Sequence, residues 1–325
     1  MNYEITATLG PASSAEQTWE AMLRTGATGF RLNTSHLNAA EMALWLRRLS
    51  DFRQRQGLSF PVVLDLQGSK WRLGQFAPRD LRLGETVRLV LAEASDQPDT
   101  LPVPHPDFFC AARAGGEAAL NDAKTLLRID AVEGNTARAI VLQGGEISPR
   151  KGITLANSEG RTETLNLRDQ SMLDAARPFA FAQYAVSYIR DAAEMERYRA
   201  LFPIGAVLIA KLERESSVRE AAAIARHADA LWLCRGDLGA ELGMPAMAAA
   251  VHDFAMVVRE ARVPVFMAGQ VLEHMVDHST PTRSEVCFLY DSLRAGYAGV
   301  ILSDECAVGK YPVEAVTAAA MFQVG

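Results

Sequence analysis

Short apolar runs alternate with longer stretches of helical periodicity along most of the chain. Several of these runs are unbroken, which is typical of parallel strands buried on both faces. Between them, Ala15–Arg24, Ala39–Gln56 and Ser216–Arg226 carry apolar residues three and four positions apart, which predicts amphipathic helices. Eight alternating units close most economically into a (β/α)8 barrel. The eight predicted strands are Ile5–Leu9, Gly29–Asn33, Pro61–Leu66, Phe181–Ser187, Ala206–Leu212, Ala230–Cys234, Val263–Ala268 and Gly299–Ser303.

One connection is far longer than the others, since more than a hundred residues separate Leu66 from Phe181. Within it, RLGETVRLVLAE, TLLRIDAVEG and TARAIVLQGG have the pattern of short strands joined by glycine-containing turns. We therefore expect a small all-β domain inserted after strand three. The predicted division gives residues 1–72 and 156–325 to the barrel catalytic domain and residues 73–155 to the insert.

Composition excludes several classes of function. The net charge is −6, so a general affinity for nucleic acid or a membrane surface is not expected. The four cysteines are scattered, and the N-terminus has neither a basic region nor a long apolar run. No run approaches the roughly 20 apolar residues of a membrane span. These features predict a reduced, cytoplasmic protein whose partners are small molecules.

Reactive groups of such barrels come from the C-terminal ends of the strands and from the loops that follow them. Polar residues gather at those ends here. They are Thr8, Gly10 and Pro11; Arg31, Asn33 and Ser35; Asp65, Gln67, Lys70 and Arg72; Lys211 and Glu213; Arg235, Gly236 and Asp237; and Ser303, Asp304 and Glu305.

Lys211 and Glu213 are two positions apart at a strand end, so their side chains should point to the same side. Glu213 and Asp237 are candidate oxygen ligands of Mg²⁺ or Mn²⁺, which take their remaining ligands from water and substrate. The alternative is a structural ion pair between Lys211 and Glu213.

Positive charge and free backbone amides complete the predicted site. Arg235, Gly236 and Asp237 follow a strand, and amides at a helix start can hold a carboxylate or phosphate. Arg31, Arg72 and Lys151 are candidate phosphate clamps if the barrel brings them together.

These segments resemble those of the pyruvate kinase family, in the same order along nearly the whole chain. The matching strings are ATLGPAS, GFRLNTSH, VVLDLQGSKWR, GGEISPRKG, VSYIR, AKLE, CRGDLG, PTRSE and ILSDECAVGKYPVEAV. The resemblance implies a barrel with a β-barrel lid domain inserted after strand three. It also implies phosphoenolpyruvate at the barrel mouth and a nucleoside diphosphate under the lid.

The resemblance also implies roles for individual residues. Lys211 would stabilise charge on the transferred phosphoryl group, assisted by Arg31 and by Lys151 from the lid. The metal ligands would be Glu213 and Asp237. Substrate-binding positions would be Arg235, Gly236, Asn33, Ser35, Asp65, Lys70 and Gly269, and nucleotide-side positions would be Thr8, Pro11, His36 and Arg72.

Family members with Lys where Lys70 stands, preceded by Leu and Gln, do not need K⁺. This chain has that pattern in Leu66, Gln67 and Lys70. An ammonium group can take the place of the monovalent cation, so the resemblance implies a K⁺-independent enzyme.

Two departures bear on function. The family has a threonine after strand seven, where this chain has Gly269, and that hydroxyl supports substrate binding and proton delivery. The family's C-terminal domain, with its effector site and one tetramer interface, has no counterpart here, so we expect a monomer or a homodimer formed through the barrel. The leading hypothesis is a short phosphotransferase that converts phosphoenolpyruvate and ADP to pyruvate and ATP. A metal-dependent aldolase, lyase or other phosphotransferase on the same site is the second hypothesis, and a non-catalytic ligand-binding relative is the third.

Overall fold

The computed structural model describes residues 1–121, 123–156 and 165–324. The chain divides into two compact units. The barrel unit consists of Met1–Gly68, Leu165–Arg235 and Ala250–Gly325, and the insert unit consists of Ser69–Thr164 and Gly236–Ala249. The insert unit thus draws on two separate stretches of sequence.

Eight parallel strands close into a barrel in the barrel unit, which confirms the predicted fold class. Each strand pairs with the barrel strand that follows it in the chain, and the last pairs with the first. Every predicted strand is present, with bounds shifted by at most two residues. The third begins at Val62 because Pro61 has no amide hydrogen to give to the ladder. The strands are β1 (Glu4–Leu9), β2 (Gly29–Asn33), β3 (Val62–Leu66), β12 (Ala182–Val186), β13 (Leu208–Leu212), β14 (Ala230–Cys234), β15 (Val265–Ala268) and β16 (Gly299–Leu302).

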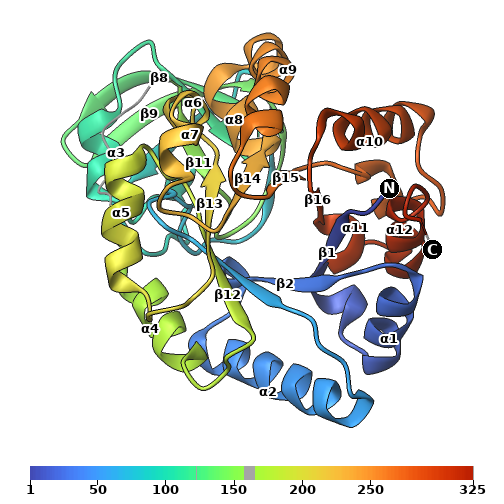
Figure 1. Ribbon diagram of the computed structural model, residues 1–325. Helices are drawn as coiled ribbons and strands as arrows, with labels where there is room; N and C mark the ends of the chain where they lie inside the picture. The colour runs from blue at the N-terminus through green and yellow to red at the C-terminus, as the bar shows by residue number, and fades with distance from the viewer. Residues whose placement is uncertain (122, 157–164, 325) are drawn as a thin grey trace. The chain divides into compact units, whose positions relative to one another are not determined.

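Helices connect these strands (Figure 1). The predicted helix Ser216–Arg226 is wrong as a single element, because it breaks at Glu220 into two short helices. In the barrel unit the helices are α1 (Glu16–Thr25), α2 (Ala39–Gln56), α4 (Leu167–Ala176), α5 (Ala192–Leu201), α6 (Glu215–Arg219), α7 (Ala221–Ile224), α10 (Arg283–Ala295), α11 (Asp304–Ala307) and α12 (Pro312–Ala319), with single turns η1 (Pro11–Ser13), η2 (Thr34–His36) and η3 (Glu273–Val276). The division between the units falls within α8 (Arg235–Leu242) and α9 (Met244–Glu260). In the part of the chain that the structure describes, no helix combines the length and apolarity that crossing a bilayer requires.

The interior of the barrel is filled by side chains from alternate positions of its strands, as packed barrels require. Trp232 and Phe266 are the aromatic residues among them. The cluster consists of Val63, Ala185, Ile209, Ala230, Trp232, Cys234, Phe266, Ala268 and Ile301.

The insert unit contains a six-stranded sheet and a two-stranded sheet. The six-stranded sheet runs in the order β11 (Ile153–Leu155), β7 (Glu117–Leu120), β8 (Thr125–Glu133), β9 (Thr136–Gln143), β5 (Thr86–Val90) and β6 (Thr100–Pro102). The two-stranded sheet pairs β4 (Arg79–Leu81) with β10 (Gly145–Ile147). A short helix, α3 (Pro106–Ala111), follows a stretch that contains Pro98, Pro102 and Pro104. Closure of these strands into a small barrel stays a prediction.

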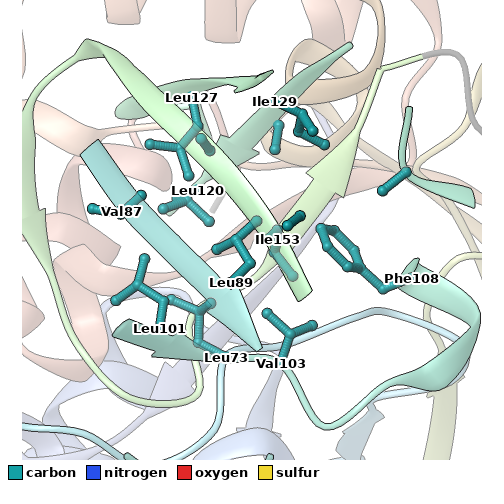
Figure 2. Close-up of a cluster of buried hydrophobic side chains, with 14 of the residues drawn as sticks. Leu73, Val87, Leu89, Leu101, Val103, Phe108, Leu120, Leu127, Ile129 and Ile153 are labelled. Carbon is teal, nitrogen blue, oxygen red and sulfur yellow. The ribbon is translucent and has the colours of Figure 1, made fainter. Parts of the chain in front are cut away.

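The insert has a hydrophobic core of its own. Figure 2 shows side chains from β5, β7, β8 and β11 converging with Phe108 of α3. Val87, Leu89 and Leu120 are fully buried in this cluster. Each fully buried aliphatic side chain contributes about 1.5–3 kcal/mol, so this unit has the means to hold its own structure.

Candidate active site

Lys211 lies at the centre of a buried charge network in the barrel unit. Its ammonium Nζ is 3.0 Å from Asp65 Oδ1 and 3.0 Å from Glu213 Oε1. It also donates to Ser187 Oγ at 2.9 Å. β3, β12 and β13 are neighbours in the barrel, so the ends of three adjacent strands supply these groups. The register pairs Asp65 with Ala185, which brings its carboxylate to the strand that precedes Ser187.

Arg31 of β2 extends the network on the other side of Asp65. Its Nε donates to Asp65 Oδ2 at 2.8 Å, and its Nη2 contacts the same oxygen. Its Nη1 donates to Thr8 Oγ1 at 2.9 Å, and this hydroxyl donates in turn to the carbonyl of Leu302. Thr8, Arg31, Asp65, Lys211 and Glu213 are therefore brought together, as predicted from strand ends.

Opposite charges in this network stabilise each other's ionised forms. Burial alone lowers the pKa of Lys211, but the Asp65 and Glu213 carboxylates outweigh it, and the net pKa lies well above the ordinary value. Burial alone raises the pKa of Asp65, but Lys211 and Arg31 bring it far below the ordinary range. Lys211 and Arg31 are consequently cations and Asp65 is a carboxylate at neutral pH. The structural ion pair between Lys211 and Glu213 is present, and it does not exclude a functional role.

Glu213 has the donor chemistry that a hard divalent cation needs. The carboxylate is 1% exposed, accepts the amide of Tyr188 at Oε2 over 2.7 Å, and faces Lys211 through Oε1. Across the described ranges, no three His, Cys, Asp or Glu residues converge on one point. Carboxylate oxygens are the ligands that hard divalent cations such as Mg²⁺ or Mn²⁺ take from proteins.

Asp237, the second predicted ligand, belongs to the insert unit together with Lys70. Lys70 Nζ lies 2.5 Å from Asp237 Oδ2, and both side chains are buried. Gly152 lies against this lysine, since a Cβ there would be 2.6 Å from Lys70 Cε. In the same unit, Arg72 donates from Nη1 to the Arg150 carbonyl at 2.8 Å, and the Leu73 amide donates to the Lys151 carbonyl.

The other predicted residues of the barrel unit lie at strand ends or in the loops that follow. Pro11 begins η1 and is exposed, and His36 is exposed at the end of η2. Asn33 caps η2 by accepting the amide of Ser35, which is buried. Gly269 follows β15 with a φ of +83°, a left-handed conformation that strongly disfavours a β-branched residue such as threonine.

Three supporting residues were not among the predicted site residues. Ser187 bonds to Lys211, although its run was counted only as a strand. Asp169 accepts the amides of Gln67 and Gly68 across about a hundred residues. Arg168 donates from one nitrogen to the carbonyls of Thr34, Ser35 and Leu37. The Asn166-to-Asp169 spacing is a helix-start signal that points to this segment, but not to its partners.

Glu305 is another buried carboxyl group near strand ends. It is 0% exposed and accepts the amides of Ser303 at 2.8 Å and Leu272 at 3.3 Å. Burial raises its pKa to about 7, against the smaller lowering effect of these amides. It therefore joins the exits of β15 and β16 through hydrogen bonds to a group that titrates near neutrality.

Comparison with known proteins places this geometry in a family context. The family model described as pyruvate kinase, barrel domain, matches residues 1–316. The pyruvate kinase of Agrobacterium vitis is 33% identical over 316 residues, covering 96% of this chain and 66% of that protein. The pyruvate kinase of Mycobacterium intracellulare is 32% identical over 318 residues, with coverages of 96% and 67%. The chain thus spans about two thirds of the length of these curated relatives.

A solved structure agrees with the sequence comparison at the level of the fold. A crystal structure of a pyruvate kinase from Cryptosporidium parvum superposes with a TM-score of 0.84 at 21% identity. The match covers 98% of this chain and 68% of that one. Because the family model spans almost the whole chain, and a relative above 30% identity aligns with 96% of it, the chain belongs to the pyruvate kinase family.

Proposed function

We propose that this chain is a pyruvate kinase-like phosphotransferase that moves the phosphoryl group of phosphoenolpyruvate to ADP, giving pyruvate and ATP. The observation that carries the proposal is the buried network of Lys211 with Asp65, Glu213, Ser187 and Arg31 at adjacent strand ends. Phosphoryl transfer needs alignment and positive charge around the moving group rather than a covalent intermediate on the protein. Two preorganised cations in a buried setting supply that charge.

Lys211 and Arg31 would have distinct tasks. Lys211 is held by three oxygens, so its ammonium group stays at one place and stays protonated while negative charge develops on the phosphoryl and enolate oxygens. Arg31 presents a planar guanidinium suited to phosphate oxygens, and its orientation is set by Asp65 and Thr8. Substituting Lys211 or Arg31 should therefore affect substrate binding as well as the rate of phosphoryl transfer.

A divalent ion, Mg²⁺ or Mn²⁺, would be held by Glu213 and Asp237. When bound, it supplies charge neutralisation and orientation for the substrate oxygens. In the insert, Lys151 and Arg72 are proposed to contact the nucleotide. We further propose that residues 73–155 act as the lid, that the protein works in the cytoplasm, and that it is a monomer or a homodimer formed through the barrel.

Lys70 is proposed to replace the monovalent cation. Its ammonium group is buried and lies 2.5 Å from the Asp237 carboxylate, so a fixed positive charge already stands beside a proposed metal ligand. Activity should change less than twofold when NaCl replaces KCl at equal ionic strength. Lys70→Glu should create a K⁺ requirement, measured as a rise in rate with KCl but not with tetramethylammonium chloride. A strong KCl requirement in the wild-type protein would contradict the proposal.

The main test is pyruvate formation coupled to lactate dehydrogenase, with phosphoenolpyruvate, ADP and Mg²⁺ or Mn²⁺. Lys211→Met is the matched control, because it keeps the side-chain length and removes the charge. Wild-type turnover at least a hundredfold above this variant is expected. Equal rates in the two proteins would sink the phosphotransferase proposal.

A repurposed enolpyruvate-type enzyme is the alternative, and Gly269 is the observation that favours it. A residue at a φ of +83° suits glycine, so the missing hydroxyl is accompanied by a backbone that does not favour threonine. Detritiation or deuterium exchange of pyruvate at C3 separates the two cases. An enzyme that transfers phosphate but protonates the enolate slowly should show weak exchange, whereas release of a different product from phosphoenolpyruvate without ADP would favour the alternative.

A further inference from the structure

The Arg235 side chain ties together the exits of two neighbouring strands. Arg235 directly follows β14 and is the first residue of α8. Its Nε and Nη2 donate to the Gly269 carbonyl at 3.0 and 2.6 Å, and Nη2 also donates to the Gln270 carbonyl at 2.8 Å. Gly269 and Gln270 directly follow β15, which pairs with β14 in the barrel. One guanidinium thus fixes both loops.

The two carbonyls that Arg235 reaches belong to residues with an uncommon backbone. Gly269 has a φ of +83° and Gln270 a φ of +53°. A glycine adopts such values readily, but a glutamine does not, and consecutive left-handed residues are rare outside tight turns. Conformations of this kind persist where surrounding contacts over-determine them, and they cluster at functional sites. Here the constraint comes from three hydrogen bonds donated by one side chain.

The charge of Arg235 is balanced in an unusual way. Its guanidinium lies 4.3 Å from the centre of the Phe288 ring. Among the described residues, no carboxylate lies within ion-pair distance of it. Burial lowers its pKa to about 10, so it remains a cation at neutral pH. Two carbonyl dipoles and an aromatic face take the place of an acidic partner, and they orient the guanidinium while leaving its net positive charge uncancelled.

We propose that the Arg235 side chain is a positioning residue, which locks the start of α8 to the left-handed corner at Gly269–Gln270 and so holds the amide of Arg235 in place for the substrate carboxylate. The inference rests on the proposed function, because Arg235 is a substrate-binding position only in a pyruvate kinase-like enzyme. The carboxylate does not react, so its interactions are the same in the ground state and the transition state. Losing the lock should therefore raise KM and leave kcat nearly unchanged.

Arg235→Met tests the lock with two independent readouts. In hydrogen exchange followed by mass spectrometry, amides of residues 269–276 should exchange at least tenfold faster than in the wild-type protein, while β3 and β13 keep their protection. In the coupled assay, KM for phosphoenolpyruvate should rise at least tenfold with kcat within threefold of wild type. Arg235→Lys, which keeps the charge and one donor group, should have a KM for phosphoenolpyruvate between those of the wild type and Arg235→Met.

Arg199→Met is the matched control. Arg199 also donates to two loop carbonyls of the barrel unit, those of Ala206 and His227, but these precede β13 and β14. Its loss should lower stability without changing KM for phosphoenolpyruvate.

Three results would overturn the lock: unchanged exchange at 269–276 in Arg235→Met, faster exchange with an unchanged KM, or loss of protection that extends to β3 and β13. The exchange measurement needs no turnover. A wild-type protein without activity on phosphoenolpyruvate would therefore count against the proposed reaction, whereas unchanged exchange counts against the lock itself.

Discussion

The buried carboxyl group of Glu305 should make stability fall as pH rises. Its pKa in the folded protein is about 7, compared with an ordinary value of 4.5. A pKa raised by folding means that the native state binds the proton more tightly than the unfolded state. The associated stability is complete below about pH 4.5 and is lost as pH rises to about 7.

The size of this effect follows from the two pKa values. Each pH unit between them corresponds to 1.36 kcal/mol, which gives about 3 kcal/mol in total. Between pH 5 and pH 8 the wild-type protein should lose about 2.5 kcal/mol of unfolding free energy through this residue. Glu305→Gln keeps the shape and cannot ionise, and its one oxygen can replace either Oε2, which accepts the Ser303 amide, or Oε1, which accepts the Leu272 amide. The unfolding free energy of the variant, relative to that of the wild type, should therefore rise by about 2.5 kcal/mol from pH 5 to pH 8.

Urea denaturation at several pH values between 5 and 8 measures this gain. The quantity of interest is the difference in unfolding free energy between variant and wild type, since other titrating groups cancel in it. Glu196→Gln, which makes the same substitution at an exposed residue of α5, is the control. A Glu305→Gln difference that stays within about 0.5 kcal/mol across the range would refute the reasoning.

Three further changes test other parts of the structure. Asp65→Asn should cost about 3–5 kcal/mol of unfolding free energy in urea at pH 7, because Lys211 and Arg31 lose their shared counter-ion. Since the pKa of Asp65 is lowered in the folded protein, the stability that its carboxylate contributes disappears only as pH falls below about 4. Equal stability of the variant and the wild type at pH 7 would contradict this prediction. Gly269→Thr should cost about 1–3 kcal/mol, measured by thermal unfolding against Ala268→Ser, because threonine is strained at a φ of +83°; no loss would show that this corner adapts. Leu89→Ala should cost about 2–5 kcal/mol and speed hydrogen exchange in β8 and β9, because Leu89 is 0% exposed in the insert core; unchanged exchange would argue against that core.

The barrel could be predicted because buried parallel strands leave a strong signal in sequence. ALWLC and VVLDL are nearly continuous apolar runs, and they become β14 and β3 within one residue of the predicted bounds. The break at Glu220 left no such signal, since no proline or glycine interrupts Ser216–Arg226. The periodicity of apolar residues indicates that a segment is helical, but it does not show where the helix breaks.

The site residues also include some that the sequence signals and some that it does not. Lys211, Asp65 and Arg31 were predictable because each is a polar residue at the end of an apolar strand. The contact of Asp169 with Gly68 spans 101 residues and depends on where two distant segments meet. The left-handed backbone at Gln270 was equally hidden, because glutamine carries no preference for it. Long-range contacts and backbone outliers are set by tertiary packing, so they become visible only in the folded chain.

The contacts of Asp169 and Asn166 have a consequence for how this architecture arises and can be rebuilt. Gly68 is the last residue of the barrel unit before the insert, and Leu165 is the first after it. The Gly68 amide donates to Asp169, and the Gly68 carbonyl accepts from the Asn166 side chain. These hydrogen bonds hold together, within the barrel unit, the two places where the chain leaves it and returns to it. Closing such a loop costs entropy that grows only slowly with its length. The segment between Gly68 and Leu165 is therefore exchangeable: a short linker, or an unrelated domain with adjacent termini, would join the same two points without reopening the barrel.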